Sequence, residues 1–209
     1  MKIITTTQFD RPEYTAKMLE SLAKCNGIHY YGLVACLDGE TPNKEVLKLL
    51  QDFRACRAVK IIINERRLGC NLNTMKALYS GFEISSSVLH VEDDVILSKD
   101  ALKQYESWAA SKDKSFSFCL YNKISDVKSY DDSMYNTVYK RPEFIPWGFG
   151  IRRHSLITML ECECFTRDEP TEASWDMKVN NMCRGLQLEH AYVFLSRANN
   201  IGEIGRAHV

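Results

Sequence analysis

Residues 87–97 read SVLHVEDDVIL, in which a short apolar run leads directly into Glu92, Asp93 and Asp94 and then into a second apolar run. The apolar residues before this acidic trio favour a β-strand that ends where the carboxylates begin. Adjacent carboxylates repel one another, and burying them without a partner is costly. Taken alone, the motif fits a solvated acidic turn between a strand and a helix, so its meaning depends on the sequence around it.

The residues before this stretch alternate between strand and helix patterns three times. We expect strands at residues 2–6, 31–37, 59–63 and 87–91, with helices at residues 14–22, 46–53 and 75–82. The alternation predicts an α/β fold whose central sheet is mostly parallel and flanked by helices. In such sheets, ligands bind beyond the carboxyl ends of the strands. Polar residues follow each predicted strand: residues 8–11, Asp38, residues 64–67 and residues 92–94. This repeated placement favours a ligand site over a solvated turn.

The second half of the chain is less regular. We expect a helix that Ser98 caps, strands at residues 116–120 and 192–195, a loop or hairpin at residues 122–141, and a helix at residues 174–186. An aromatic stretch at residues 144–151 is interrupted by Pro146 and two glycines. The pattern gives the elements of this half but not their order in a sheet.

The composition is that of an ordinary globular protein. The 209 residues are 45% hydrophobic, and 27 Lys and Arg balance 27 Asp and Glu. A neutral chain gives no electrostatic reason to bind nucleic acid or an anionic membrane. Because we find no secretory signal and no apolar run of the roughly 20 residues that a membrane span needs, we expect a cytoplasmic protein that is complete at its N-terminus. The eight cysteines include no C-x-x-C pair and are expected to be reduced and space-filling.

A divalent cation would relieve the repulsion within the acidic trio. Mg²⁺ and Mn²⁺ prefer oxygen ligands and typically take one or two protein carboxylates, which leaves positions for phosphate oxygens and water. Such a cation would also neutralise the charge that develops on a leaving diphosphate. The trio therefore predicts a site for Mn²⁺ or Mg²⁺ together with a phosphate-bearing ligand.

Segments along nearly the whole chain resemble the glycosyltransferases of the GT-A fold. In the first half these are residues 5–12 (TTTQFDRP), 36–39 (CLDG), 64–78 (NERRLGCNLNTMKAL) and the trio, which is similar to a D-x-D metal motif in an E-D-D form. The E-D-D form resembles the N-acetylglucosaminyltransferase I type. Three later segments agree with that type: residues 144–150 (FIPWGFG), 174–176 (SWD) and 196–208 (SRANNIGEIGRAH). Each motif is short, and their shared order is more specific than any one of them.

The resemblance implies a single domain over residues 1–209, in which residues 1–97 bind a nucleotide sugar and residues 98–209 bind an acceptor. The implied donor is a UDP-sugar such as UDP-N-acetylglucosamine, the acceptor is a glycan or another hydroxyl compound, and the cofactor is Mn²⁺ or Mg²⁺. The implied donor-binding residues are Thr6, Arg11, Asp38, Arg67, Asn71, Lys76, Glu92 and Asp93. The implied metal ligands are Asp94 and His208, and the implied acceptor-binding residues are Trp147, Gly148 and Trp175.

Asp176 is the catalytic base that the resemblance implies. It would take the proton of the attacking hydroxyl, and one base with a metal-bound leaving group implies a single, inverting displacement. The residues alone favour another role, an aspartate in the first turn of a helix that Ser174 caps. Asp38-Gly39 is similarly a common turn dipeptide, and tryptophans commonly pack in cores. Those structural interpretations stay open at this point.

Two other functions also stay open. A sugar-phosphate nucleotidyltransferase has a similar fold, but such enzymes carry a glycine-rich phosphate loop near the N-terminus, and residues 4–11 contain no glycine. A non-catalytic domain that binds nucleotide sugars or glycans is the other alternative. The intact acidic trio together with Asp176 counts against it.

Overall fold

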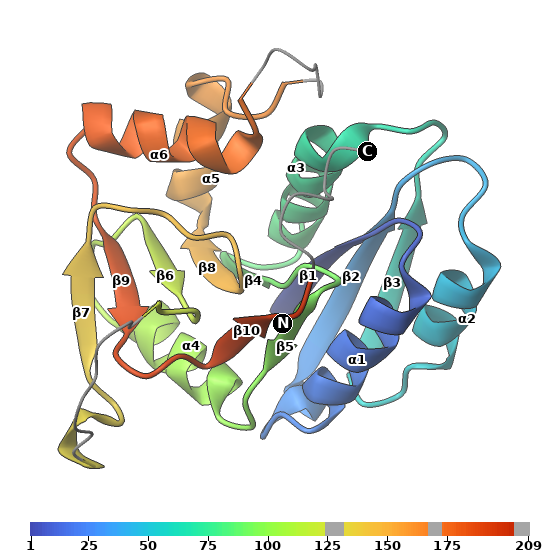
Figure 1. Cartoon of the computed structure of the whole chain (residues 1–209), viewed down its shortest axis with the longest axis horizontal. Coiled ribbons are helices and arrows are strands. Elements are labelled where there is room, and N and C mark those ends of the chain that lie inside the picture. The colour runs from blue at the N-terminus through green and yellow to red at the C-terminus, as the bar shows by residue number, and fades with distance from the viewer. Residues whose placement is uncertain (124–131, 167–172, 203–209) are drawn as a thin grey trace.

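The computed structural model describes residues 1–123, 132–166 and 173–202. Its centre is an eight-stranded sheet with the order β3-β2-β1-β4-β8-β6-β9-β7, and β5 and β10 form a separate two-stranded sheet (Figure 1). The strands are β1 Lys2–Gln8, β2 Tyr31–Leu37, β3 Ala58–Ile63, β4 Ser87–His90, β5 Val95–Leu97, β6 Ser117–Cys119, β7 Val138–Arg141, β8 Phe149–Arg152, β9 His190–Val193 and β10 Ala198–Asn200.

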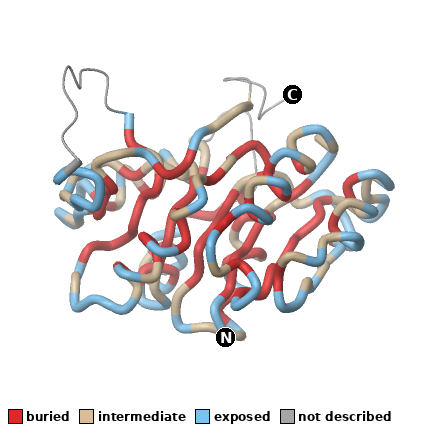
Figure 2. The backbone as a smooth tube through the Cα atoms, turned by 90° about the horizontal axis from the view of Figure 1, so that it is seen from below, coloured by how far each residue is buried: buried red, intermediate tan, exposed pale blue. Residues whose placement is uncertain are grey.

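Helices cover both faces of the sheet. They are α1 Pro12–Ala23, α2 Lys44–Asp52, α3 Gly69–Phe82, α4 Ala101–Ala110, α5 Arg153–Glu161 and α6 Trp175–Gly185, with short 3₁₀ turns at Ile28–Tyr30 and Asp132–Met134. One core cluster includes buried residues of α1, α2 and α4, and a second includes those of α3, α5 and α6. The sheet is therefore the middle of three layers, and Figure 2 shows its strands mostly buried with exposed stretches on the surrounding helices and loops.

The sheet has a parallel part and a mixed part. Strands β1, β2, β3 and β4 pair in parallel, as the alternating pattern predicts. Beyond β4, strand β8 pairs antiparallel with both of its neighbours, β6 and β9 are parallel, and β7 is antiparallel to β9. The chain thus forms the expected α/β fold with helices on the sheet, but its second half is mixed rather than parallel.

Local packing explains why the parallel part forms so regularly. Every residue of β2 is buried, which matches the unbroken apolar run that a central parallel strand requires. In α3, a Cβ on Gly81 would lie 2.8 Å from Val88 Cγ1 and also collide with Thr5. A glycine at this position lets the last turn of α3 lie close against β1 and β4.

Several expected elements need correction in the second half. Helix α5 and strand β10 are not in the expected set, and in the stretch 144–151 the strand begins only at Phe149. The last expected strand, at residues 192–195, is observed at His190–Val193. Asp100, not Ser98, occupies the N-cap position of α4, and the Ser98 hydroxyl donates a hydrogen bond to the Asp100 carboxylate. In the first half, α3 begins at Gly69, earlier than the apolar pattern indicates.

Candidate functional site

The polar residues that follow the parallel strands lie at one edge of the sheet. The parallel register carries past the strand ends, because the Asp38 amide donates to the Gln8 carbonyl (2.9 Å) and the Asn64 amide donates to the Leu37 carbonyl (3.0 Å). On the other side of β1, the Val91 amide donates to the Thr5 carbonyl (2.9 Å). The ends of these four strands are therefore adjacent, which is the position at which ligands bind in folds of this class.

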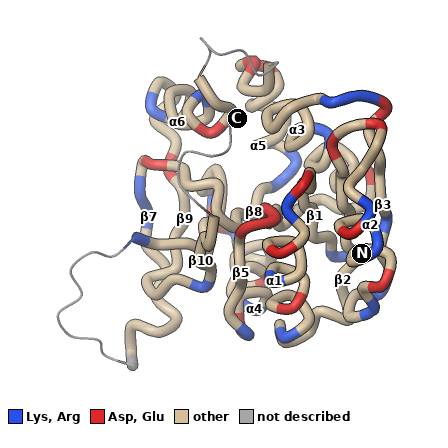
Figure 3. The backbone as a smooth tube through the Cα atoms, turned by 45° about the vertical axis from the view of Figure 1, so that its right-hand side comes forward, with Lys and Arg blue, Asp and Glu red and all other residues tan. Residues whose placement is uncertain are grey.

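Arg11 joins the first strand end to the acidic trio. Its Nε donates to Asp93 Oδ2 (3.0 Å), one of its terminal nitrogens donates to Asp93 Oδ1, and the other donates to Asp94 Oδ2 (3.0 Å). The side chains of Asp93 and Asp94 are 6% and 12% exposed, whereas that of Arg11 is 38% exposed. The guanidinium therefore lies on the solvent side of two nearly buried carboxylates. Figure 3 shows acidic and basic stretches of the backbone side by side near β1.

The end of β10 holds Asp94 from another direction. Asn200 Nδ2 donates to Asp94 Oδ1 (3.1 Å), and the Ile201 amide donates to the Asp94 carbonyl (2.8 Å). A Cβ on Gly202 would collide with the Asp94 carboxylate, so only glycine fits there without a shift. Strand β10 reaches this position by pairing antiparallel with β5, which directly follows the trio.

The electrostatic environment disfavours ionisation of Glu92 and Asp93. Burial raises the pKa of Asp93 to about 6, even though the charge of Arg11 lowers it. Burial also raises the pKa of Glu92 well above its ordinary value, and the charges of Asp94, Asp93 and Asp176 add to this effect. Burial opposes the charged form of Arg11, but the two aspartates raise its pKa overall. The site thus concentrates negative charge that a single arginine offsets only in part.

Asp176 comes from the second half of the chain and lies within electrostatic range of the acidic trio. It lies in the first turn of α6, where the Ser174 hydroxyl donates a hydrogen bond to its carboxylate. Its charge contributes to the raised pKa of Glu92, so the two carboxylates lie within electrostatic range of each other. The Trp175 amide donates to Asn71 Oδ1 on α3 (3.0 Å), and this bond ties the start of α6 to the first half.

Asp38 has partners within the protein. Its Oδ1 accepts the Leu68 amide (2.7 Å) and Asn64 Nδ2 (3.2 Å), and its Oδ2 accepts the Gly69 amide (2.9 Å). Gly39 follows with φ +95°, which is typical of a turn glycine. Asp38 therefore stabilises the start of α3.

The other implied donor-binding residues lie around the same strand ends. Thr6 is buried in β1, and its hydroxyl accepts a hydrogen bond from Gln8 Nε2 (2.8 Å). Arg67 is exposed and lies over the Phe9 ring, with its guanidinium carbon 4.7 Å from the ring centroid. Lys76 is half-buried on α3, and its charge acts on the Cys36 thiol in β2.

The implied acceptor-binding residues separate into different environments. Trp175 is only 2% exposed, and its ring packs on Phe144, Phe149 and Phe165, so it is a core residue and not the accessible acceptor-binding residue that the resemblance implies. Trp147 is half-buried and contacts Tyr121 edge to face.

Gly148 has φ +75°, and a Cβ there would lie 3.2 Å from Ala198 Cβ. Its own position is therefore set by backbone conformation and by close packing on β10. His208, the second implied metal ligand, lies outside the described residues.

The donor chemistry of the site fits a hard divalent cation. Within the described ranges, no group of three or more His, Cys, Asp or Glu side chains is arranged to hold a metal ion. Asp93 and Asp94 nevertheless offer adjacent, nearly buried carboxylates, and Mg²⁺ or Mn²⁺ often uses only one or two protein carboxylates when phosphate oxygens complete the shell. The residues therefore fit a cation that binds together with a phosphate-bearing ligand.

Sequence reasoning missed Asn200 as a site residue. It lies within the motif 196–208, but nothing in that motif indicates that its side chain contacts Asp94, 106 residues away in sequence. It also missed that Arg11 contacts the carboxylates, because opposite charges 82 and 83 residues apart give no periodic signal.

Comparison with known proteins shows the fold. The sequence matches no protein-family model and no curated protein. In structure, the chain is similar to residues 1–349 of TarS from S. aureus. The match has a TM-score of 0.66 and 15% sequence identity, and it covers 95% of this chain and 60% of that chain. A mannosyltransferase from Pyrobaculum calidifontis, in complex with GDP-Man and Mn²⁺, is also similar (TM-score 0.60, 10% identity, 98% of this chain and 58% of that chain).

GalNAc-T7, in complex with UDP, GalNAc and Mn²⁺, gives a third match (TM-score 0.66, 13% identity, 98% of this chain and 44% of that chain). TarS 1–349 has also been solved in complex with UDP-GlcNAc (TM-score 0.65). The chain thus has the GT-A glycosyltransferase fold, and it spans about 60% of the length of the TarS fragment. No described helix has both the length and the apolar character needed to cross a membrane.

Proposed function

We propose that this protein is a metal-dependent, inverting glycosyltransferase that transfers a sugar from a nucleotide-diphosphate donor to a hydroxyl group of a glycan or similar acceptor. The observation that carries the proposal is the meeting of Arg11, Asp93 and Asp94 at the carboxyl ends of the parallel strands, in a chain with the GT-A fold. Asp176, from the other half, lies within electrostatic range of the same trio.

The donor is a UDP-sugar in this proposal, with UDP-N-acetylglucosamine as the first candidate. It is supported by the E-D-D motif of the N-acetylglucosaminyltransferase I type and by the UDP-GlcNAc complex of the similar TarS structure. Asp38, Thr6 and Arg67 lie around the strand ends where the nucleoside would bind. Asn71 and Lys76, on α3, complete the proposed donor site.

Asp94 is the proposed direct metal ligand, with Glu92 and Asp93 beside it and His208 as a further ligand. A bound Mn²⁺ or Mg²⁺ supplies positive charge that stabilises the departing diphosphate. The burial of Asp93 and Asp94 strengthens this interaction, because water screens charges less in a nearly buried site.

Asp176 is the proposed general base. Its carboxylate accepts a hydrogen bond from Ser174, which orients it at the start of α6. In the reaction it takes the proton from the acceptor hydroxyl while that oxygen attacks the anomeric carbon, so one bond forms as the bond to the diphosphate breaks. A single displacement of this kind inverts the configuration at the anomeric carbon. Trp147 and Gly148 remain the proposed acceptor-side residues.

The test is calorimetric titration of the protein with UDP and UDP-N-acetylglucosamine, with and without Mn²⁺. We expect metal-dependent binding that is lost in Asp94→Ala, and an exposed-site control such as Asp52→Ala should bind like the wild type. If a folded protein binds no nucleotide diphosphate under any of these conditions, the trio is a structural turn and the proposal is wrong.

A further inference from the structure

Arg11 and the β10 segment occupy every carboxylate oxygen of Asp93 and Asp94. Arg11 donates to both oxygens of Asp93 and to Oδ2 of Asp94, and Asn200 donates to the remaining Oδ1 of Asp94. A cation that binds either carboxylate would therefore compete with a protein donor for the same oxygen.

Arg11 is the partner that carries charge, and it is also the more accessible one. Its side chain is 38% exposed, and its guanidinium lies 5.3 Å from the centroid of the Tyr14 ring at the start of α1. The opposite side of Asp94 is closed, because Gly202 packs so closely on the carboxylate that a Cβ would collide with it. Arg11 therefore lies on the solvent side of these oxygens.

The electrostatic balance favours such an exchange. One guanidinium faces two adjacent carboxylates, both of them nearly buried. A divalent cation brings twice the charge of an arginine and prefers oxygen ligands. The two cations repel one another at contact distance, so the presence of one weakens the binding of the other at these oxygens.

We propose that Arg11 is the resident counter-cation of the metal site, and that a divalent cation binds to Asp94 in competition with it. The inference rests on the proposed metal-dependent function and adds a competition that sets metal affinity. Arg11 keeps the two carboxylates paired in the absence of metal and weakens the binding of the free ion. Arg11 is therefore a positioning residue for the carboxylates.

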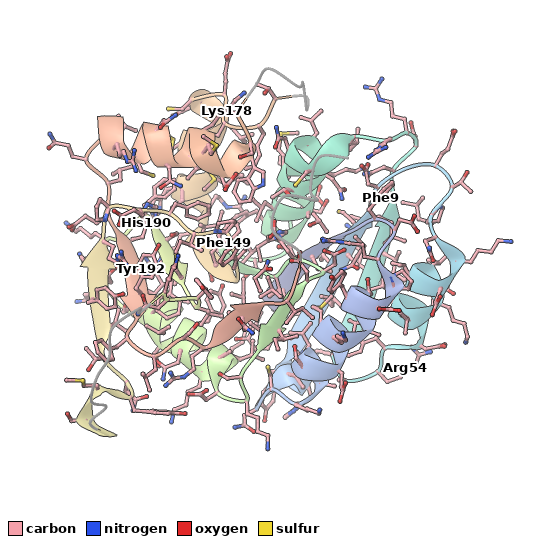
Figure 4. The ribbon with its side chains drawn as sticks, viewed as in Figure 1. Phe9, Arg54, Phe149, Lys178, His190 and Tyr192 are labelled. Carbon is pink, nitrogen blue, oxygen red and sulfur yellow. The ribbon has the colours of Figure 1, made fainter. Side chains whose placement is uncertain are left out.

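The test measures Mn²⁺ binding alone, by calorimetry at pH 8 without nucleotide, in Arg11→Gln, Arg11→Lys and the wild type. Removing the competing charge should tighten Mn²⁺ binding in Arg11→Gln by roughly 10-fold, within the range usual for coupled sites. Arg11→Lys keeps the charge and should stay close to the wild type. Arg54→Gln is the matched control, because Arg54 is exposed beyond α2 (Figure 4) and its side chain donates to the backbone carbonyls of Gln51 and Phe53.

A second measurement, thermal unfolding, covers the possibility that Arg11→Gln is poorly folded at 25 °C without metal. The variant leaves two nearly buried carboxylates without their arginine, so its melting temperature should fall in the absence of metal and recover more than that of the wild type when Mn²⁺ is added. Arg54→Gln should show neither effect.

Two outcomes overturn the inference, and they are distinguishable. If the wild type binds Mn²⁺ with UDP but Arg11→Gln binds Mn²⁺ alone no more tightly than the wild type does, the competition is absent while the proposed function stands. If no variant binds Mn²⁺ with or without UDP, the metal-dependent function and this inference both fail.

Discussion

The two halves of the sheet contribute residues to the candidate site in different ways. Strands β1 to β4 form a parallel block whose loops deliver Arg11, Asp38 and the acidic trio to one edge. The other half delivers Asp176 from a helix and Asn200 from a strand that pairs with β5, outside the main sheet. The repeated strand–helix unit thus builds the proposed donor site, whereas Asp176 and Asn200 are brought to it by less regular segments of the chain.

The halves also contain a matched pair of buried histidines. His90 on β4 shares a hydrogen bond with the Thr5 hydroxyl (2.9 Å), and His190 on β9 shares one with the Ser117 hydroxyl (2.7 Å). Phe149, on β8 between them, stacks obliquely on His90, and Figure 4 labels Phe149 and His190. In both parts of the sheet, a neutral imidazole forms a hydrogen bond to a hydroxyl on the neighbouring strand and thereby stabilises the sheet.

The largest expected effect tests whether the chemistry is divided between the halves. Asp176→Asn removes the proposed base from the second half and leaves the parallel block untouched. Turnover should fall by about 100- to 10,000-fold, the usual contribution of a general base, while UDP binding in the presence of Mn²⁺ stays unchanged. Steady-state kinetics and calorimetry check this together. Normal turnover in the variant would show that the second half does not supply the base.

The next prediction concerns the core of the second half. Trp175→Ala removes a ring packed on Phe144, Phe149 and Phe165, so we expect a loss of about 3–5 kcal/mol in the free energy of unfolding. Urea unfolding measures it. Trp147→Ala, at a half-buried position, should cost clearly less. Equal losses in the two variants would contradict the assignment of Trp175 to the core.

The two histidines predict a dependence of stability on pH. Burial lowers the pKa of His90 to about 3 and that of His190 to about 4, from an ordinary value of 6.5. The unfolded chain therefore binds protons that the folded protein does not, and stability is lost as the pH falls below 6.5. Between pH 6.5 and 5 each histidine should cost about 2 kcal/mol.

The measurement is urea unfolding as a function of pH in the wild type, His90→Gln and His190→Gln. Each variant should have a smaller slope than the wild type. The raised pKa of Asp93 gives a contribution of opposite sign between about pH 4 and 6, but it is common to all three proteins and cancels in the comparison. An unchanged slope in either variant would mean that its histidine is protonated in the folded state.

The smallest expected effect tests the link between the halves. Asn71→Ala removes the acceptor of the Trp175 amide and should lower the free energy of unfolding by about 1 kcal/mol. Because this bond holds the start of α6 and Asn71 is also a proposed donor-site residue, the activity should fall further than the stability loss alone explains. Asn199→Ala, at an exposed position on β10, is the control and should change neither property.

Much of the first half could be predicted from local pattern. The strands at 31–37 and 59–63 agree with the structure within about a residue, and the placement of polar groups after successive strands correctly predicted a shared edge. The sequence of the second half has weaker apolar periodicity. Strand β10, only three residues long, and helix α5 have too little apolar periodicity to be recognised without the neighbours that bury them.

The sequence by itself determined the class of fold, the sheet edge that carries the site, and the acidic trio as its centre, because alternation and spacing are local properties of the chain. Tertiary structure decided which charges meet. It placed Arg11 on Asp93 and Asp94, turned both oxygens of Asp38 toward the start of α3, and buried Trp175 in the core. Such contacts join residues far apart in sequence, and their partners are set by the packing of the whole sheet.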